Sequence, residues 1–177
     1  MKIRNKFLSI ALLLSTLLCL SSSFSSSTKM QNKCVYTIYA RTGSIVKAGT
    51  DSRVSLVLGD SSGNSVWIPN LKHWGLMGQD HDYFERANLD IFTGRGRCMG
   101  RPVCRVNVTS DGSGTRPGWY LNYVEVTSTG PHIPCSQSLF HVEQWLALDV
   151  PPYKLTAQID RCEPKKPISE ARRFLVK

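Results

Sequence analysis

Apolar and polar residues alternate along much of the chain between residues 34 and 160. In Arg53–Leu58 apolar side chains recur at every second position, and Val103–Thr109 repeats the pattern. A period of two is typical of a half-buried β-strand, because successive side chains point to opposite faces. Both segments are therefore predicted to be strands. Six further segments have a similar character: 35–40, 65–68, 88–92, 119–127, 140–148 and 154–159.

Clusters of glycine, proline, serine and aspartate separate these segments. The clearest are Asp60–Gly63, Gly94–Gly96, Ser110–Gly114 and Pro151–Pro152. Such residues favour tight turns, and no helical period longer than about two turns interrupts the strand candidates. Eight short strands with frequent turns predict an all-β fold, either an antiparallel sandwich or a barrel.

The candidate strand 119–127 is rich in aromatic and β-branched residues on both faces. This composition is typical of a strand that is buried on both sides. Trp119 and Tyr123 share one face of a regular strand, so we expect both to fill the core between the sheets. The alternative is that these rings stack on a ligand.

The N-terminal segment 1–27 has the features of a secretory signal peptide. A basic start precedes the apolar run Phe7–Leu20 and a serine-rich stretch. That run is shorter than the ~20 residues that span a bilayer, although an uncleaved anchor is the alternative. We expect a soluble protein, secreted or in the lumen of the endoplasmic reticulum. A domain over 28–162 is expected to follow, with a basic tail, 163–177, that is flexible or touches a membrane.

The net charge of +9 is concentrated at the two ends of the chain. Removal of 1–27, which holds three basic residues, lowers the charge to +6. The segment 161–177 accounts for +4 of the remainder. The body of the domain is close to neutral, which together with secretion argues against nucleic acid as a partner.

Five cysteines follow the predicted leader: Cys34, Cys98, Cys104, Cys135 and Cys162. In an oxidising compartment disulfides are expected, and the odd number leaves one thiol over. We predict Cys34–Cys162, which would join the ends of the domain, and Cys98–Cys104, which would close a short loop. Cys135 is then free. The competing interpretation of the cysteines is a zinc site, but the sequence has no C-x₂-C pair to favour it.

Three segments carry a family resemblance: AGTDSRVSLVLGD (48–60), DYFERANLDIF (82–92) and GWYLNYVEV (118–126). Together and in this order they resemble the PLAT domain (polycystin, lipoxygenase, α-toxin), also called the lipoxygenase homology domain. The opening CVYTIYARTGS, the SDGSG turn and the ending VEQWLALDVPPY are similar to small secreted plant PLAT proteins that are embryo-specific or stress-induced. The resemblance implies an eight-stranded antiparallel β-sandwich of two four-stranded sheets over 34–160.

Some PLAT domains bind calcium at loop ends, and the resemblance therefore makes calcium a candidate cofactor. The matching groups are the backbone carbonyls of Lys47, Ala48 and Gly49 and the side chains of Asp82 and Glu85, with Asp51 nearby. Gly49 also suits a turn with an unusual backbone angle. The family's calcium binders have acidic residues just before the tryptophan of the third segment, whereas this chain has Arg116–Gly118 there. The alternative is that Asp82 and Glu85 make turn hydrogen bonds or a salt bridge.

The loop LKHWGLMGQDHDY (71–83) holds Trp74, Leu76 and Met77 among glycines, without a strand pattern to bury them. Exposed apolar side chains on a loop are typical of a membrane or partner contact. The alternative is that the loop folds back onto the sandwich.

Asn107-Val108-Thr109 is an N-glycosylation sequon. The alternation in this segment places Asn107 on the polar face, away from Val106 and Val108. Glycosylation of Asn107 is therefore predicted, with an unmodified strand residue as the alternative.

No catalytic motif such as G-x-S-x-G, H-E-x-x-H or a phosphate-binding loop is found. His73 and His81 lie in one polar loop, where solvated histidines are more common than metal ligands. We therefore expect a monomeric, non-enzymatic module that binds lipid, a membrane or a protein, in plant stress response or seed development. A cell-wall carbohydrate-binding module is the alternative.

Overall fold

The computed structural model of the protein describes residues 33–163. The strands are β1 (Lys33–Thr42), β2 (Val54–Asp60), β3 (Ser65–Ile68), β4 (Leu89–Arg97), β5 (Val103–Ser110), β6 (Trp119–Gly130), β7 (Ile133–Leu146) and β8 (Thr156–Asp160). One turn of 3-10 helix, η1 (Leu71–Trp74), follows β3. No helix in 33–163 is long and apolar enough to cross a membrane. The predicted signal peptide and nearly all of the predicted tail lie outside the described residues.

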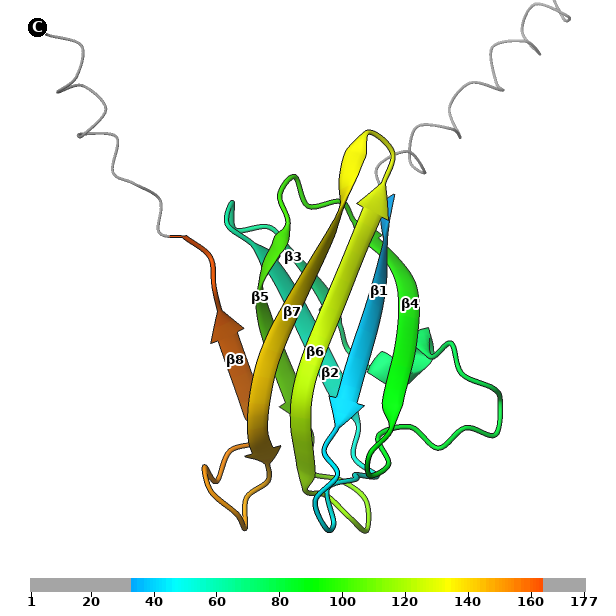
Figure 1. Ribbon diagram of the computed structural model, residues 1–177, viewed down its shortest axis with the longest axis vertical. Helices are drawn as coiled ribbons and strands as arrows, with labels where there is room; N and C mark the ends of the chain where they lie inside the picture. Colours follow the sequence, from blue (N-terminus) through cyan, green and yellow to red (C-terminus); the bar gives the residue numbers. More distant parts are fainter. Residues whose placement is uncertain (1–32, 164–177) are drawn as a thin grey trace, which may run out of the picture. The chain divides into compact units, whose positions relative to one another are not determined.

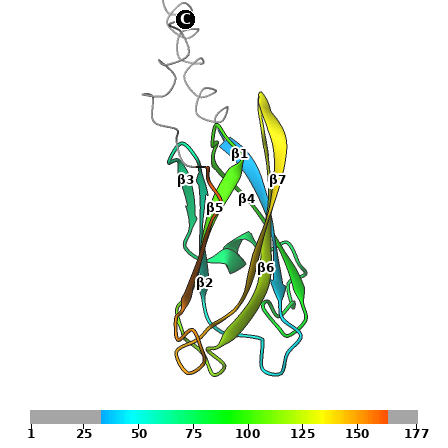
Figure 2. The same cartoon turned by 60° about the vertical axis from the view of Figure 1, so that its left-hand side comes forward.

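The eight strands form two antiparallel four-stranded sheets (Figure 1). Their orders are β4-β1-β6-β7 and β3-β2-β5-β8. Figure 2 shows the two sheets edge-on and side by side, with η1 between them. The predicted all-β sandwich of two four-stranded sheets is confirmed, and the alternative of a barrel is excluded because the two sheets share no strand pairing.

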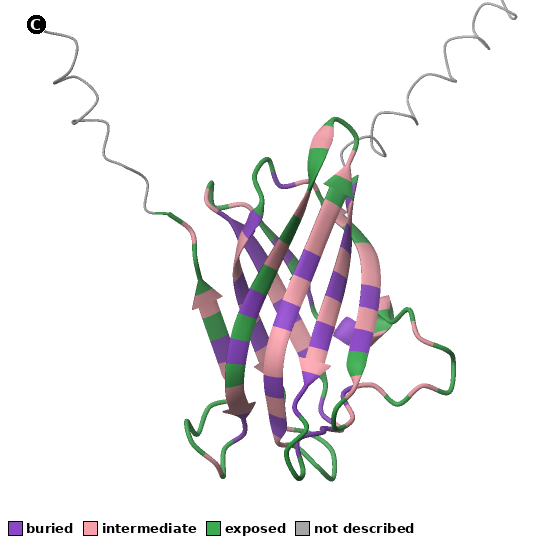
Figure 3. Ribbon diagram, viewed as in Figure 1, coloured by how far each residue is buried: buried purple, intermediate pink, exposed green. Residues whose placement is uncertain are grey.

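The core lies between the sheets and follows the period-two pattern of the sequence. On β1, Tyr36, Ile38 and Ala40 are buried while the residues between them are half-buried (Figure 3). Each fully buried large apolar side chain contributes about 1.5–3 kcal/mol relative to an exposed one. Repeated over eight strands, this one-sided burial is the reason that the alternating segments fold as a sandwich.

A β-bulge in β6 changes the face on which Tyr123 lies. In the pairing with β1, Arg41 lies opposite Tyr123 and Thr42 lies opposite Leu121, so β6 has one extra residue there and its alternation is reset. Trp119 and Leu121 point into the core, as do Val124 and Val126, but Tyr123 does not. The expectation that Trp119 and Tyr123 share the core face was correct for Trp119 and wrong for Tyr123.

The predicted disulfide pairs are wrong. The structure has Cys34–Cys98 and Cys104–Cys162, with Cα–Cα distances of 4.8 and 4.9 Å. Each bond joins neighbouring strands of one sheet, β1 to the end of β4 and β5 to the end of β8. The short segment between Cys98 and Cys104 connects the two sheets, so it does not close on itself. Cys135 is exposed and unpaired, as expected.

Candidate functional site

Four loops meet at one end of the sandwich, here called the loop end: residues 43–53, 80–88, 111–118 and 147–155 (Figure 1). Backbone hydrogen bonds hold the first three together. Thr50 N–H donates to Phe84 O at 3.1 Å, and Asp51 N–H donates to Arg116 O at 3.1 Å. The family-like segments 48–60, 82–92 and 118–126 therefore meet in space at this end.

Thr50 and Ser52 connect two of these loops through their hydroxyl groups. Thr50 Oγ1 donates to Arg116 O at 2.9 Å, and Ser52 Oγ donates to Ser113 O at 2.7 Å. Both residues are buried, and a buried hydroxyl is stabilising only when it is paired. The Thr-Asp-Ser sequence after Gly49 thus orders the loop 111–118.

Gly49 is required for close packing and not for an unusual backbone angle. A Cβ atom at this position would lie 2.9 Å from Arg86 N and 3.1 Å from Phe84 O. The left-handed conformation expected at Gly49 is instead adopted by Lys47, with φ of 64°. The absence of a side chain at Gly49 lets the loop 80–88 lie directly against it.

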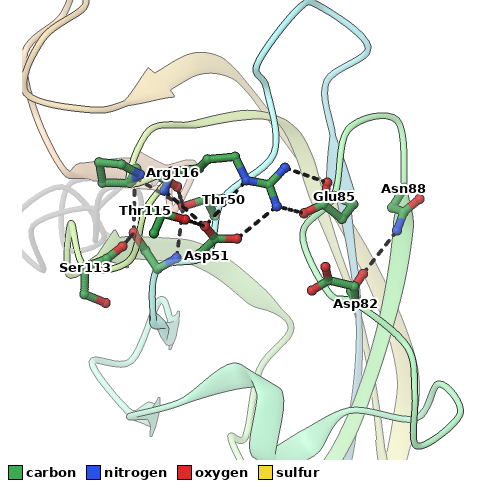
Figure 4. Close-up of polar contacts among 10 residues, drawn as sticks. Thr50, Asp51, Asp82, Glu85, Asn88, Ser113, Thr115 and Arg116 are labelled. Atoms are coloured by element: carbon green, nitrogen blue, oxygen red, sulfur yellow. Dashed lines mark hydrogen bonds and ion pairs between the residues drawn. The ribbon is translucent and has the colours of Figure 1, made fainter.

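Arg116 lies between two carboxylates at the centre of the loop end. Its Nη2 is 3.1 Å from Asp51 Oδ1 and 2.7 Å from Glu85 Oε1 (Figure 4). Asp51 Oδ2 also accepts hydrogen bonds from Thr115 Oγ1 at 2.7 Å and from Arg116 N at 3.0 Å. The Thr115 hydroxyl and the Arg116 guanidinium hold the pKa of Asp51 below its usual value.

The residues at this site do not fit calcium. Calcium takes six to eight oxygen ligands, but the guanidinium of Arg116 already lies between Asp51 and Glu85. The carbonyl of Ala48 accepts the Tyr120 N–H at 2.9 Å. No group of three or more potential acidic, histidine or cysteine ligands is found within residues 33–163.

The predicted ligand Asp82 stands apart from Arg116. Asp82 is exposed, and only its backbone carbonyl is engaged, by Asn88 Nδ2 at 3.4 Å (Figure 4). Of the six positions named for calcium, the structure therefore joins Asp51 and Glu85 through an arginine and leaves Asp82 outside the network.

Asp90 anchors the loop 80–88 from inside, and the sequence analysis did not identify it. Its carboxylate is fully buried; Oδ1 lies 2.6 Å from His81 Nε2, and Oδ2 accepts the Phe84 N–H at 2.7 Å. His81 is thus paired rather than solvated. A signal was present, since Asp90 shares a strand face with the core residue Phe92, where an acidic residue needs partners.

Trp74 is half-buried rather than fully exposed. Its ring lies over Gly94 of β4 and packs against the core, so this part of the loop 71–83 folds back onto the sandwich. Met77 is half-buried and its N–H donates to Tyr83 Oη at 3.0 Å. Of the three residues predicted to contact a membrane, only Leu76 is largely exposed.

The largest exposed apolar side chains of the loop end lie on the tips of two other loops. Val46 is 76% exposed, and Leu148 and Tyr153 are 68% and 60% exposed. A hollow of about 470 Å³ between these two loops is lined in part by Val46, Trp145 and Val150. The sequence analysis missed Leu148 because it placed this residue at the end of the strand candidate 140–148. It missed Val46 and Tyr153 because the exposure of a loop tip depends on the tertiary structure.

Comparison with known proteins agrees with this architecture. Residues 21–146 match the model of the family described as Embryo-specific protein 3. PLAT domain-containing protein 1 of Arabidopsis thaliana is 56% identical over 133 residues, which are 75% of this chain and 74% of that protein.

Two solved lipoxygenase structures share the fold. Delta413-417:GS LOX matches with a TM-score of 0.56 and 19% identity, over 80% of this chain and 19% of that chain. A calcium-dependent 11R-lipoxygenase matches with a TM-score of 0.50 and 18% identity, over 72% of this chain and 17% of that chain. This chain thus spans about a fifth of each lipoxygenase. From its sequence match, its two-sheet topology and its loop segments, the chain belongs to the PLAT domain family, within the group that the Embryo-specific protein 3 model describes.

Proposed function

We propose that this protein is a non-enzymatic module that docks its loop end on a lipid surface and needs no calcium to do so. The observation that carries the proposal is the exposure of Val46, Leu148 and Tyr153 on neighbouring loop tips. Apolar side chains on loop tips gain free energy by entering the interface of a bilayer. Tyrosine suits this depth because one end of its side chain is apolar and the other is polar.

A lysine follows two of these apolar tips directly. Lys47 follows Val46, and Lys154 follows Tyr153. Both lysines are exposed, and neither is in an ion pair among residues 33–163. A lysine beside an inserted side chain can keep its ammonium group at the level of the headgroups. This arrangement favours an anionic lipid surface over an uncharged one.

Arg116 supports the independence from calcium. It links the loops that carry Asp51 and Glu85 with a covalently attached positive charge, so these loops are ordered without a metal. We further propose that the protein acts in the secretory lumen or outside the cell, in plant embryo development or stress response. The description of the matching family, Embryo-specific protein 3, supports the role in the embryo. The two disulfides support the oxidising compartment.

Sedimentation with phosphatidylcholine–phosphatidylserine vesicles tests the docking. The double variant Val46→Ser/Leu148→Ser should weaken binding at least about ten-fold, because two apolar side chains no longer enter the bilayer. Chelation of calcium should leave the binding of the unmodified protein unchanged.

Two matched variants complete the experiment. Leu139→Ser removes an exposed apolar side chain from the middle of β7 and should have no effect. Leu76→Ser tests the loop 71–83. A loss of binding in Leu76→Ser with full binding in the double variant would show that the loop end is not the contact surface. Failure of the unmodified protein to sediment would contradict lipid docking altogether.

A further inference from the structure

The outer face of the second sheet holds two unexplained features in one row across the strands. In register, Val57 of β2 pairs with Trp67 of β3 on one side and with Asn107 of β5 on the other. Trp67 is 69% exposed. The Asn107 side chain has Oδ1 buried without a hydrogen-bond partner. A large exposed indole and an unpaired buried amide oxygen are each unusual, and each requires an explanation.

The alternation of β5 fixes the direction of Asn107. Val106 and Val108 on either side are buried in the core, so Asn107 points away from the core. Asn107 is half-buried, and Oδ1 is its buried, unpaired amide atom; in the arrangement proposed below, Nδ2 faces solvent. This is the nitrogen to which an N-linked glycan is attached, and Asn107-Val108-Thr109 is the sequence that is recognised.

We propose that Asn107 carries an N-linked glycan whose first sugar packs on Trp67. Adjacent strands lie about 4.8 Å apart, so the Cα atoms of Trp67 and Asn107 are separated by roughly 10 Å. A sugar attached at Nδ2 extends over Val57 and reaches the indole. Its apolar face then covers the aromatic ring, which removes apolar surface from water.

The reaction is a transfer from a lipid-linked oligosaccharide by a host transferase in the endoplasmic reticulum. A bond forms between Asn107 Nδ2 and C1 of the sugar, and the bond between C1 and the lipid pyrophosphate breaks. Nδ2 loses one proton, and the lipid pyrophosphate leaves. Transfer takes place on the extended chain, before β5 pairs with β2 and β8, so the central position of β5 in its sheet is no obstacle.

The proposal rests on the secretory setting proposed above but not on lipid docking, because this face is distinct from the loop end. The full chain is produced in plant cells with its own N-terminal segment and recovered with both disulfides formed, which shows passage through the oxidising compartment. Treatment with peptide N-glycosidase should lower the mass by that of one glycan and convert Asn107 to aspartate. Disulfide-bonded protein with unmodified Asn107 would overturn the proposal.

Thr109 provides the matched pair of variants. Thr109→Ala removes the sequon, whereas Thr109→Ser keeps the sequon and the hydroxyl that lies 3.1 Å from Thr156 Oγ1. The alanine variant should lack the glycan, and the serine variant should carry it. Retention of the glycan in Thr109→Ala would place it elsewhere on the chain and contradict the assignment.

Trp67 is tested by comparing glycosylated and enzymatically deglycosylated protein. The glycan should raise Tm by about 2–4 °C, and this difference should disappear in Trp67→Ala, because the two groups are coupled only if they touch. In Leu139→Ala, which changes an exposed side chain of the other sheet, the difference should remain. An equal difference in Trp67→Ala and in the unmodified protein would show that the sugar does not pack on the indole.

Discussion

At the scale of single residues, Arg116 sets the chemistry of the loop end. Its guanidinium pairs with Asp51 at 3.1 Å and with Glu85 at 2.7 Å, so two carboxylates that would otherwise repel each other are held together. The sequence showed that acidic residues were missing at Arg116–Gly118. It did not show that Arg116 would turn back to the carboxylates, because that contact joins residues far apart in the chain.

We expect Arg116→Ala to make the protein responsive to calcium. Without the guanidinium, Asp51 and Glu85 are left unpaired near one another, and a divalent cation that binds there stabilises the folded state. Millimolar calcium should raise the Tm of Arg116→Ala by about 2–4 °C and leave the unmodified protein unchanged in differential scanning fluorimetry.

The control for this experiment is Arg86→Ala. Arg86 is an exposed arginine at the same end whose Nη1 donates only to Ser44 O, at 3.4 Å. Its removal should create no response to calcium. A calcium response of the unmodified protein equal to that of Arg116→Ala would refute the view that the arginine takes the place of a metal.

At the scale of elements, all eight strand candidates are present, and the differences lie at strand ends. The predicted turn Gly94–Gly96 is part of β4. The candidate strand 140–148 begins earlier, at Ile133. Its first half is exposed and rich in serine and glutamine, because it pairs with β6 as a hairpin and contributes little to the core. Apolar alternation detects strands that cover a core, and it does not detect strands that hydrogen bonding alone extends.

The disulfide pairs also depend on which strands are neighbours, which local sequence patterns do not record, and they give a second prediction. Removal of either disulfide, by Cys34→Ala/Cys98→Ala or Cys104→Ala/Cys162→Ala, should lower the free energy of unfolding by about 4 kcal/mol. The reason is that the pairs close long segments, with sequence separations of 64 and 58 residues. Urea denaturation measures the change.

Cys135→Ala is the control, since Cys135 is exposed and unpaired; its free energy of unfolding should change little. Peptide mapping without reduction tests the pairing directly. A peptide in which Cys98 is joined to Cys104 would contradict the arrangement in which each bond links neighbouring strands.

At the scale of the described domain, carboxylates on several loops make the stability of the folded state depend on pH. The hydroxyl of Ser113 and the backbone N–H groups of Ser113 and Arg53 lower the pKa of Asp111. Burial opposes ionisation of Asp60, but hydrogen bonds from Asn64 and Ser62 outweigh it and lower the pKa of Asp60 as well. A carboxylate with a lowered pKa stabilises the fold only while it is ionised.

The pH dependence follows from the direction of these pKa shifts. The folded-state pKa values of Asp60 and Asp111 lie below the usual value for an aspartate, so the unfolded state binds more protons as the pH falls. The stabilisation is fully present above about pH 5 and is lost as the pH falls below about 4. Thermal unfolding between pH 3 and pH 7 should therefore show a Tm that is constant near neutrality and decreases in acid.

Asp60→Asn tests the assignment. The variant keeps an amide oxygen that can accept the hydrogen bonds of Ser62 and Asn64 at 2.9 Å but does not titrate there. Its Tm should decrease less between pH 5 and pH 3 than that of the unmodified protein. Asp149→Asn, at an exposed position, should have the same acid profile as the unmodified protein. If both variants lose Tm equally in acid, Asp60 is not a source of the dependence.

The sequence by itself determined the fold class, the strand candidates and the family, because alternation and turn residues are local properties that each strand carries independently. It also marked Arg116–Gly118 as a departure from calcium binding. The tertiary structure decided the disulfide pairs, the outward position of Tyr123, the packing of Trp74 against β4 and the partners of Asp90 and Arg116. These depend on strand order, on a bulge and on loops that meet from distant parts of the chain, and no local pattern records where such segments come together.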